Sequence, residues 1–232
     1  MSLLKHFNPN IVNIKAYQPG RSVDEVKSAY QLESATKLCS NESPFPPSPE
    51  VVKAICQATL QVGRYPYDPA PHLKQLLAEK DYLAVEQITL GAGSSELFDI
   101  LLRSLCQPKE SVIVSQYSFA LYRTLCQAHD LNVIEIKENQ FLHDLDATLE
   151  AITPTTKVIF VTNPNNPTGS WIEKQALFDF IEAVPEHVFV VVDEAYHDFM
   201  HQQDYSSAAQ LVDKHSRLIV IRTFSKAYGL AG

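Results

Sequence analysis

The chain has 232 residues, of which 45% are hydrophobic and 20% are charged, and its formal net charge is -8. This composition is typical of a globular protein with enough chain to bury a core. The negative charge argues against a nucleic-acid or anionic-membrane partner. No apolar run is long enough to cross a bilayer, and the N-terminus lacks the apolar core of a signal peptide. The four cysteines form no CxxC pair, so we expect neither a disulfide nor a metal site. We also expect a cytoplasmic location, where thiols stay reduced.

The first part of the chain, residues 1–35, is predicted to be an N-terminal arm, and residues 36–232 the main domain. Within that domain the segment 40–49 is too rich in proline for a helix or a central strand. It is therefore predicted to be an ordered loop, or otherwise a linker. Ser48 can cap the helix that follows, with Pro49 at the first helical position.

Beyond residue 87 short apolar strands alternate with amphipathic helices. Continuous apolar strands of this kind predict an α/β fold with three layers, αβα, around a mainly parallel sheet. Ligands of such sheets bind beyond the carboxyl ends of the strands, so the polar residues at those ends are the candidates for function. Strands are expected over 88–90, 112–114, 132–136, 157–161, 188–192 and 218–221. Helices are expected over 23–30, 72–82, 94–106, 119–128, 144–152 and 173–184.

The first candidate site is a run of small residues, Gly91–Ala92–Gly93–Ser94, between a predicted strand and a helix. Small residues let backbone N–H groups approach an anion, and the N-terminus of a helix favours negative charge. The run matches neither a P-loop nor the full dinucleotide fingerprint. We therefore expect a phosphate cradle. The alternative is a plain strand-turn-helix in which Ser94 caps the helix.

Three further strand ends carry unusual polar residues. Tyr117 can stack on a flat ring, or it packs in the core. The segment 163–169 has two prolines and three asparagines, which indicates a rigid turn that can contain a cis Asn–Pro bond, or otherwise a surface turn. Asp193 ends an all-apolar strand, where a carboxylate is costly unless it meets a cation or a strong donor. Tyr196 can face the same pocket. The alternative for Asp193 is a cap of the next segment.

The last predicted strand leads through Thr223 and Ser225 to Lys226. A lysine at the mouth of a buried strand is desolvated, which disfavours its charged form and makes it a candidate amine nucleophile. The alternative is a solvated lysine that begins a helix.

Three of these segments together, 163–169, 192–196 and 223–232, resemble the fold-type I pyridoxal-phosphate aminotransferases. The segments 17–20, 38–44 and 64–66 resemble, more narrowly, the histidinol-phosphate aminotransferases. The resemblance implies transfer of an amino group from L-histidinol phosphate to 2-oxoglutarate, giving imidazole acetol phosphate and L-glutamate in histidine biosynthesis. Alternatives on the same scaffold are an aromatic aminotransferase and an amino-acid-phosphate decarboxylase. A non-catalytic module that binds pyridoxal 5'-phosphate, or a fragment that binds nothing, also stays open.

The resemblance also implies roles for single residues. Lys226 would bind the cofactor aldehyde and move a proton at the substrate α-carbon. Asp193 would pair with the N–H of the pyridine ring and keep it electron-poor. Asn166 and Tyr196 would hydrogen-bond the phenolate oxygen of the ring. The other implied contacts are phosphate binding by Ala92, Gly93, Ser94, Thr223 and Ser225, phosphate binding in the other subunit of a homodimer by Tyr65, ring stacking by Tyr117, and substrate contact by Tyr17 and Asn41.

Members of this family continue well past the lysine motif, with a segment that supplies two functional arginines and most of a small domain. No arginine follows Lys226 here. The resemblance therefore implies a chain truncated at its C-terminus, either a shortened product or an incomplete sequence. We expect the intact parent to be active, and this piece alone to expose core surface and to be weakly active or inactive.

Overall fold

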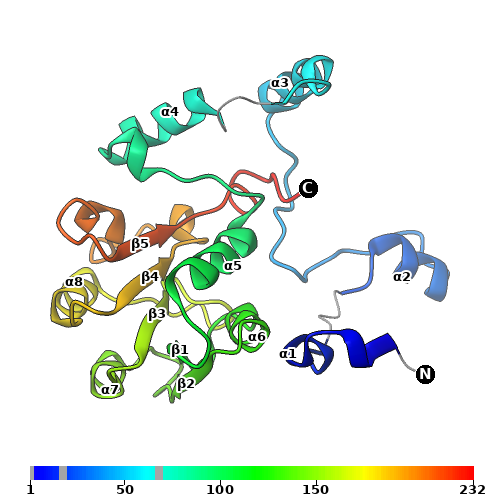
Figure 1. Ribbon diagram of the computed structural model, residues 1–232. Helices are drawn as coiled ribbons and strands as arrows, with labels where there is room; N and C mark the ends of the chain where they lie inside the picture. Colours follow the sequence, from blue (N-terminus) through cyan, green and yellow to red (C-terminus); the bar gives the residue numbers. More distant parts are fainter. Residues whose placement is uncertain (1–2, 16–19, 66–69) are drawn as a thin grey trace. The chain divides into compact units, whose positions relative to one another are not determined.

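The computed structural model describes residues 3–15, 20–65 and 70–232 (Figure 1). The chain forms two compact units. The larger unit comprises Met1–Ile14 and Val62–Thr223, and the smaller unit comprises Lys15–Gln61 and Phe224–Gly232. The functional boundary expected near residue 35 stays a prediction.

The larger unit is built on a five-stranded sheet whose order is β2-β1-β3-β4-β5. Every neighbouring pair is parallel, so the expected parallel sheet is confirmed. The chain adds β2 on one side of β1 and then adds β3 on the other side, which places the reversal of strand order between β1 and β3. The strands are β1 (Ser111–Ser115), β2 (Asn132–Ile136), β3 (Thr156–Thr162), β4 (Phe189–Asp193) and β5 (Leu218–Ile221).

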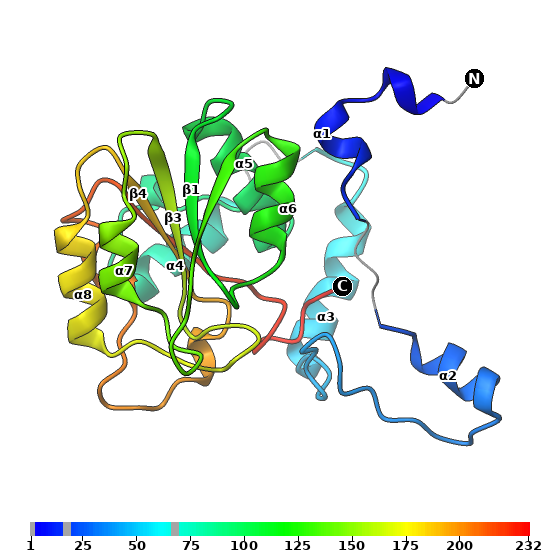
Figure 2. The ribbon, with the colours of Figure 1, turned by 90° about the horizontal axis from the view of Figure 1, so that it is seen from below.

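Helices cover both faces of this sheet (Figure 2). On one face lie α5 (Ser94–Leu105) and α6 (Leu121–Ala128), and on the other lie α7 (Leu145–Glu150) and α8 (Lys174–Ala183). The three-layer αβα fold is therefore confirmed. The remaining helical elements of the larger unit are η1 (Leu3–His6), α1 (Pro9–Val12), α4 (Pro71–Asp81), η3 (Val85–Gln87), η4 (His197–Phe199) and η5 (Ala208–Leu211).

The two faces of the sheet have separate buried clusters, because side chains alternate along each strand. On β4, Val191 belongs to the cluster with α5 and α6, whereas Val190 and Val192 belong to the cluster with α8. The same alternation continues at the carboxyl end of the strand. It directs Asp193 and Glu194 to opposite faces of the sheet.

One predicted strand is wrong. The segment 88–90 is irregular and follows the 3-10 turn η3. A strand needs a hydrogen-bonded neighbour, and no strand within the described part of the chain pairs with this segment. The β-branched and apolar residues of this segment favour a strand locally, but the described part of the chain has no neighbouring strand to pair with it.

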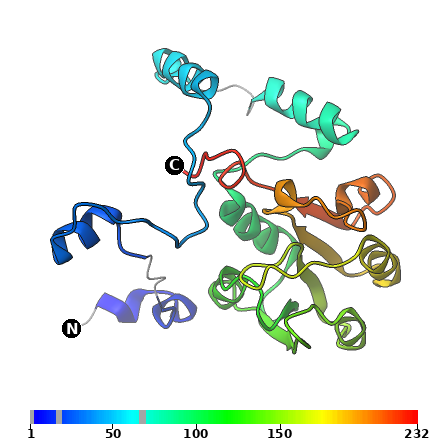
Figure 3. The same ribbon diagram turned by 180° about the vertical axis from the view of Figure 1, so that it is seen from behind.

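The smaller unit contains α2 (Val23–Tyr30), α3 (Pro49–Ala58) and η2 (Thr59–Gln61). Ser48 caps α3 by accepting the N–H of Val51 at 3.4 Å, with Pro49 at the first helical position, as expected. The C-terminal segment runs beside residues 43–47 (Figure 3). A Cβ atom on Gly229, whose φ is +66°, would lie 3.4 Å from the carbonyl oxygen of Phe45. None of the described helices has the length and the apolar character to cross a membrane.

Candidate functional site

Polar residues gather at the carboxyl edge of the sheet, where β3, β4 and β5 end side by side. Thr162 of β3 is paired with Asp193 of β4, and Asp193 is paired with Ile221 of β5. The strand order reverses next to this point, between β1 and β3. In parallel α/β sheets ligands bind at such an edge, beside the reversal. The carboxyl edge is therefore the candidate site in the larger unit.

Asp193 is buried at this edge, with 4% of its surface exposed. Its Oδ2 accepts a hydrogen bond from the Tyr122 hydroxyl at 2.5 Å, and its Oδ1 accepts one from the N–H of Ala195 at 3.0 Å. The Tyr122 oxygen also lies 3.1 Å from Oγ1 of Thr162. The bond from Ala195 closes a local turn two residues on. Asp193 is not the cap of the next segment, because the N-cap residue of η4 is Tyr196. The bond from Tyr122 is the strong donor that a buried carboxylate requires.

Tyr122 was not predicted as a site residue, and it is completely buried in α6. Burial, followed by the charge of Asp193, raises the pKa of the Tyr122 phenol well above its usual value. The phenol therefore keeps its proton and acts as a donor to the carboxylate. In the sequence Tyr122 lies in an amphipathic helix, and this pattern is the same for a tyrosine that only packs in the core.

Glu194 lies on the opposite face and was also not predicted. It is 1% exposed, and its Oε2 accepts hydrogen bonds from Arg222 Nε at 3.0 Å and from Ser207 Oγ at 2.7 Å. The N–H of Ala208 binds its Oε1 at 2.7 Å. Arg222 continues to Asp81 at the end of α4, with Nη1 at 2.9 and 3.1 Å from the two carboxylate oxygens. This buried ion pair joins the ends of β4 and β5.

The carboxylates around Arg222 also control its charge. Burial alone would lower the pKa of the guanidinium, but the charges of Glu194 and Asp81 outweigh burial and raise that pKa above its usual value. Arg222 therefore stays a cation between two acids.

The small-residue run before α5 forms a turn at the start of a helix, as expected. The N-cap residue is Gly93 with a φ of +82°, so the alternative in which Ser94 caps the helix is wrong. A side chain at this φ is strained, which explains the glycine. The N–H of Ala92 donates to Oε2 of Glu96 at 2.6 Å. A carboxylate oxygen thus already binds a backbone N–H of this turn, as an oxygen of a phosphate would.

The cradle and Asp193 are linked through two aromatic side chains, Phe98 and Tyr122. Phe98, one turn into α5, contacts Tyr122 edge to face with the ring centroids 5.1 Å apart. Because Tyr122 binds Asp193, the N-terminal part of α5 lies on the Asp193 side of the sheet.

Tyr117 follows β1 and is 38% exposed, so it does not pack in the core. Its backbone is held from two sides. Oε1 of Glu138 lies 3.3 Å from its N–H, and Nδ2 of Asn165 donates to its carbonyl oxygen at 3.3 Å. Its ring lies 5.3 Å from that of Phe141. The side chain is therefore presented at the carboxyl edge beside the reversal of strand order.

The segment 163–169 is a turn whose first three residues are buried, whereas its last four are half-buried or exposed. Both of its Asn–Pro bonds, Asn163–Pro164 and Asn166–Pro167, are cis, as the sequence allowed. Asn163 and Asn165 are buried, and Oδ1 of Asn163 accepts the N–H of Ile172 at 2.9 Å. Within the described part of the chain, Nδ2 of Asn163 and Oδ1 of Asn165 are buried without a hydrogen-bond partner. Asn166, the residue with an implied role, is half-buried.

The other predicted site residues of the larger unit differ in how much of each is exposed to solvent. Tyr196 is half-buried just before η4, with its ring 6.5 Å from that of Phe199. Thr223 is half-buried two residues after β5. Tyr65 is 97% exposed.

In the smaller unit, Lys226 lies in a turn and is half-buried, so the alternative of a solvated lysine that begins a helix is wrong. Its Nζ donates to the carbonyl oxygen of Ser40 at 3.2 Å. Asn41, for which a substrate contact was implied, is the next residue. The structure thus brings the lysine motif together with the segment 38–44. Ser225 is half-buried in the same turn, and Tyr17 lies outside the described residues.

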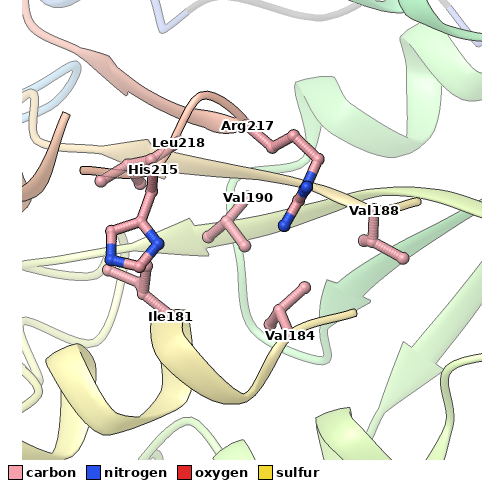
Figure 4. Close-up of a pocket in the computed structure, with 7 residues that line it drawn as sticks. All are labelled: Ile181, Val184, Val188, Val190, His215, Arg217 and Leu218. Atoms are coloured by element: carbon pink, nitrogen blue, oxygen red, sulfur yellow. The ribbon is translucent and has the colours of Figure 1, made fainter. Parts of the chain in front are cut away.

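A small cavity lies at the other edge of the sheet, near the amino ends of β4 and β5 (Figure 4). Its volume of about 10 Å³ is close to the lower limit for one water molecule, so it is not a cofactor site. It is lined by Ile181, Val184, Val188, Val190, His215, Arg217 and Leu218. No group of metal-ligating side chains is found in residues 3–15, 20–65 and 70–232.

Comparisons with known proteins identify the family. A model described as "Aminotransferase class I and II" matches residues 33–232. A histidinol-phosphate aminotransferase of Nitrosococcus oceani is 40% identical over 222 residues, which are 96% of this chain and 60% of that protein. One of Hydrogenovibrio crunogenus is 41% identical over 223 residues, with the same coverage.

Solved structures agree with these relatives. A crystal structure of histidinol-phosphate aminotransferase from Sinorhizobium meliloti, in complex with pyridoxal-5'-phosphate, matches with a TM-score of 0.85 and 29% identity. The match covers 97% of this chain and 60% of that one. The chain thus spans about 60% of the length of the curated relatives it matches. Because the family model covers most of its residues, the chain belongs to the class I and II aminotransferase family.

Proposed function

We propose that the protein is a pyridoxal 5'-phosphate-dependent aminotransferase that moves the amino group of L-histidinol phosphate to 2-oxoglutarate. The observation that carries this proposal is the buried carboxylate of Asp193 at the carboxyl end of β4. The names of the similar proteins support the choice of substrate.

The residues of the larger unit fit this cofactor. The turn before α5 has an N–H that already binds a carboxylate oxygen, which is the chemistry that a phosphate group needs. Asp193 is a buried acceptor that neutral donors orient, which suits a ring N–H. Tyr117 presents an exposed ring whose backbone is fixed. These observations support cofactor binding at this edge of the sheet.

When bound, pyridoxal 5'-phosphate supplies an electron-poor ring that stabilises negative charge at the substrate α-carbon. Asp193 would hold the proton on the ring nitrogen. Lys226 would hold the cofactor and would accept and return the proton at the substrate α-carbon. Asn166 and Tyr196 would bind the ring oxygen. The phosphate would be bound by Ala92, Gly93, Ser94, Thr223 and Ser225, the ring face by Tyr117, and the substrate by Tyr17 and Asn41.

A homodimer in the cytoplasm is part of the same proposal. Tyr65 is 97% exposed, so its phenol is available to the cofactor phosphate of a second copy. All four cysteines are free, which suits a reducing compartment. Sedimentation of the purified protein gives the oligomeric state, and a monomer with bound cofactor would contradict the role of Tyr65.

The test is trapping followed by turnover. Borohydride reduction with pyridoxal 5'-phosphate is expected to leave an adduct on Lys226, which peptide mass spectrometry locates. The Lys226→Ala variant is expected to leave none at that position. Absence of the adduct from the wild-type protein would refute the proposed function.

Substrate choice is tested by turnover of histidinol phosphate, phenylalanine and threonine phosphate with 2-oxoglutarate. We expect histidinol phosphate to react fastest. Fast reaction of another donor without reaction of histidinol phosphate would overturn that choice and leave the aminotransferase family intact. A protein that binds the cofactor but whose absorption glutamate does not change would be a binding module.

A further inference from the structure

The hydroxyl of Tyr122 lies between two strand ends inside an otherwise apolar cluster. It is 2.5 Å from Oδ2 of Asp193 and 3.1 Å from Oγ1 of Thr162, and the tyrosine is completely buried. Burial of a hydroxyl costs free energy unless it is hydrogen-bonded. A phenylalanine would fill the same space without that cost. The hydroxyl therefore has a function that packing does not explain.

The ring of Tyr122 is already fixed by aromatic contacts. It stacks on Phe160 with the centroids 4.3 Å apart and the planes at 2°, and it meets Phe98 and Phe119 edge to face at 5.1 and 5.8 Å. Such contacts hold the ring in one place. The position of the hydroxyl relative to Asp193 is thus set before any ligand binds.

The direction of the hydrogen bonds follows from the chemistry of the groups. Tyr122 has one hydroxyl hydrogen, and it goes to Asp193. The hydroxyl of Thr162 then donates to the oxygen of Tyr122. Two hydroxyls in series point toward one carboxylate, and hydrogen bonds in such a chain strengthen one another. A donor to a carboxylate stabilises its charged form.

We propose that Tyr122, supported by Thr162, is a positioning residue that fixes the Asp193 carboxylate and keeps it a weak base. This inference rests on the proposed function, in which Asp193 holds the proton on the cofactor ring. Without the hydroxyl, Asp193 becomes a stronger base and draws that proton toward itself. The ring then withdraws electrons less well, so the proton at the substrate α-carbon is removed more slowly.

The discriminating variant is Tyr122→Phe, which removes only the hydroxyl and keeps the ring contacts. We expect kcat to fall about tenfold, because a hydrogen bond to a charged group is lost. KM is expected to change less than about twofold. The pH midpoint of the visible absorption of the bound cofactor is expected to move by roughly one unit, which is the same factor of ten.

Thr148→Val is the matched control. It removes another buried hydroxyl, which donates to the carbonyl oxygen of Asp144 at 2.6 Å in α7, on the opposite face of the sheet. We expect this variant to keep the wild-type pH midpoint and kcat. A Tyr122→Phe protein with the midpoint and kcat of the wild type would overturn the proposal.

A second measurement needs no cofactor. In a double-mutant cycle with Tyr122→Phe and Asp193→Ala, the unfolding equilibrium constants of the cofactor-free protein report the coupling of the two side chains. We expect a coupling of about tenfold, and none between Thr148→Val and Asp193→Ala. Additive effects would refute the hydrogen bond. If the wild-type protein forms no cofactor adduct on Lys226, the proposed function fails, whereas an unshifted variant of an active wild type refutes only the role of Tyr122.

Discussion

Arg222, just after β5, is the cation between the buried Glu194, just after β4, and the part-buried Asp81 at the end of α4, and its removal tests the structure most directly. In Arg222→Met a side chain of similar length remains, but the buried Glu194 carboxylate loses the guanidinium that is 3.0 Å from its Oε2. The side chain of Glu194 is 0% exposed, so water cannot replace the guanidinium. Removing one partner of a buried ion pair costs about 3–5 kcal/mol, because the other charge stays buried and uncompensated. We expect a loss of this size in the free energy of unfolding.

Urea unfolding of the cofactor-free protein, followed by far-ultraviolet circular dichroism, measures this loss. Arg103→Met is the matched control, because its 3.5 Å contact with Asp99 joins side chains that are 61% and 36% exposed. Such a surface pair contributes about 0.5 kcal/mol or less. The double variant Arg222→Met/Glu194→Gln has no uncompensated buried charge at residue 194. We expect its free energy of unfolding to fall less than that of Arg222→Met alone. A loss for Arg222→Met as small as that for Arg103→Met would refute the buried ion pair.

Two further predictions concern titratable side chains. Burial lowers the pKa of His143 below its usual value, so the unfolded chain binds that proton at a higher pH than the folded protein does. Stability from this site is therefore present above about pH 6.5 and is lost as the pH falls through the window below it. Between about pH 7.5 and about pH 5.5 we expect the wild type to lose up to about 1 kcal/mol more than His143→Gln, and equal losses would contradict the burial. For the thiols, burial raises the pKa of Cys106 to about 11 and that of Cys126 to about 12, whereas Cys39 and Cys56 are exposed. Ellman's reagent at neutral pH should label two thiols quickly in the native protein and four in denaturant, and fast labelling of three or more would show that the core opens.

Much of the larger unit could be predicted from the sequence because its signals are local. The strands 132–136 and 218–221 were predicted with the bounds that the structure shows. In 218–221 an uninterrupted apolar run indicates a strand covered on both faces, and such strands belong to parallel sheets. Asp193 was singled out for an equally local reason, since a carboxylate directly after an all-apolar strand needs a specific partner.

What escaped prediction depends on register between segments far apart in the chain. Asp193 and Tyr122 are 71 residues apart, and Arg222 and Asp81 are 141 apart. Neither pair has a sequence pattern, because each forms only when neighbouring strands and helices are aligned. The segment 88–90 failed for the related reason that a strand signal does not supply a partner strand.

Two adjacent acids at the end of β4 are both buried, and the alternation of side chains gives each a different set of donors. Asp193 points to the face of α5 and α6, where the Tyr122 phenol and the N–H of Ala195 donate to it. Glu194 points to the other face, where it meets the Arg222 guanidinium. Neutral donors orient a carboxylate and do not cancel its charge, whereas a guanidinium does both. Because Arg222 compensates Glu194, the charge of Glu194 repels the neighbouring carboxylate less. The sheet edge therefore orients Asp193 with donors on one face, and on the other face the adjacent acid joins β4 to β5 through Arg222.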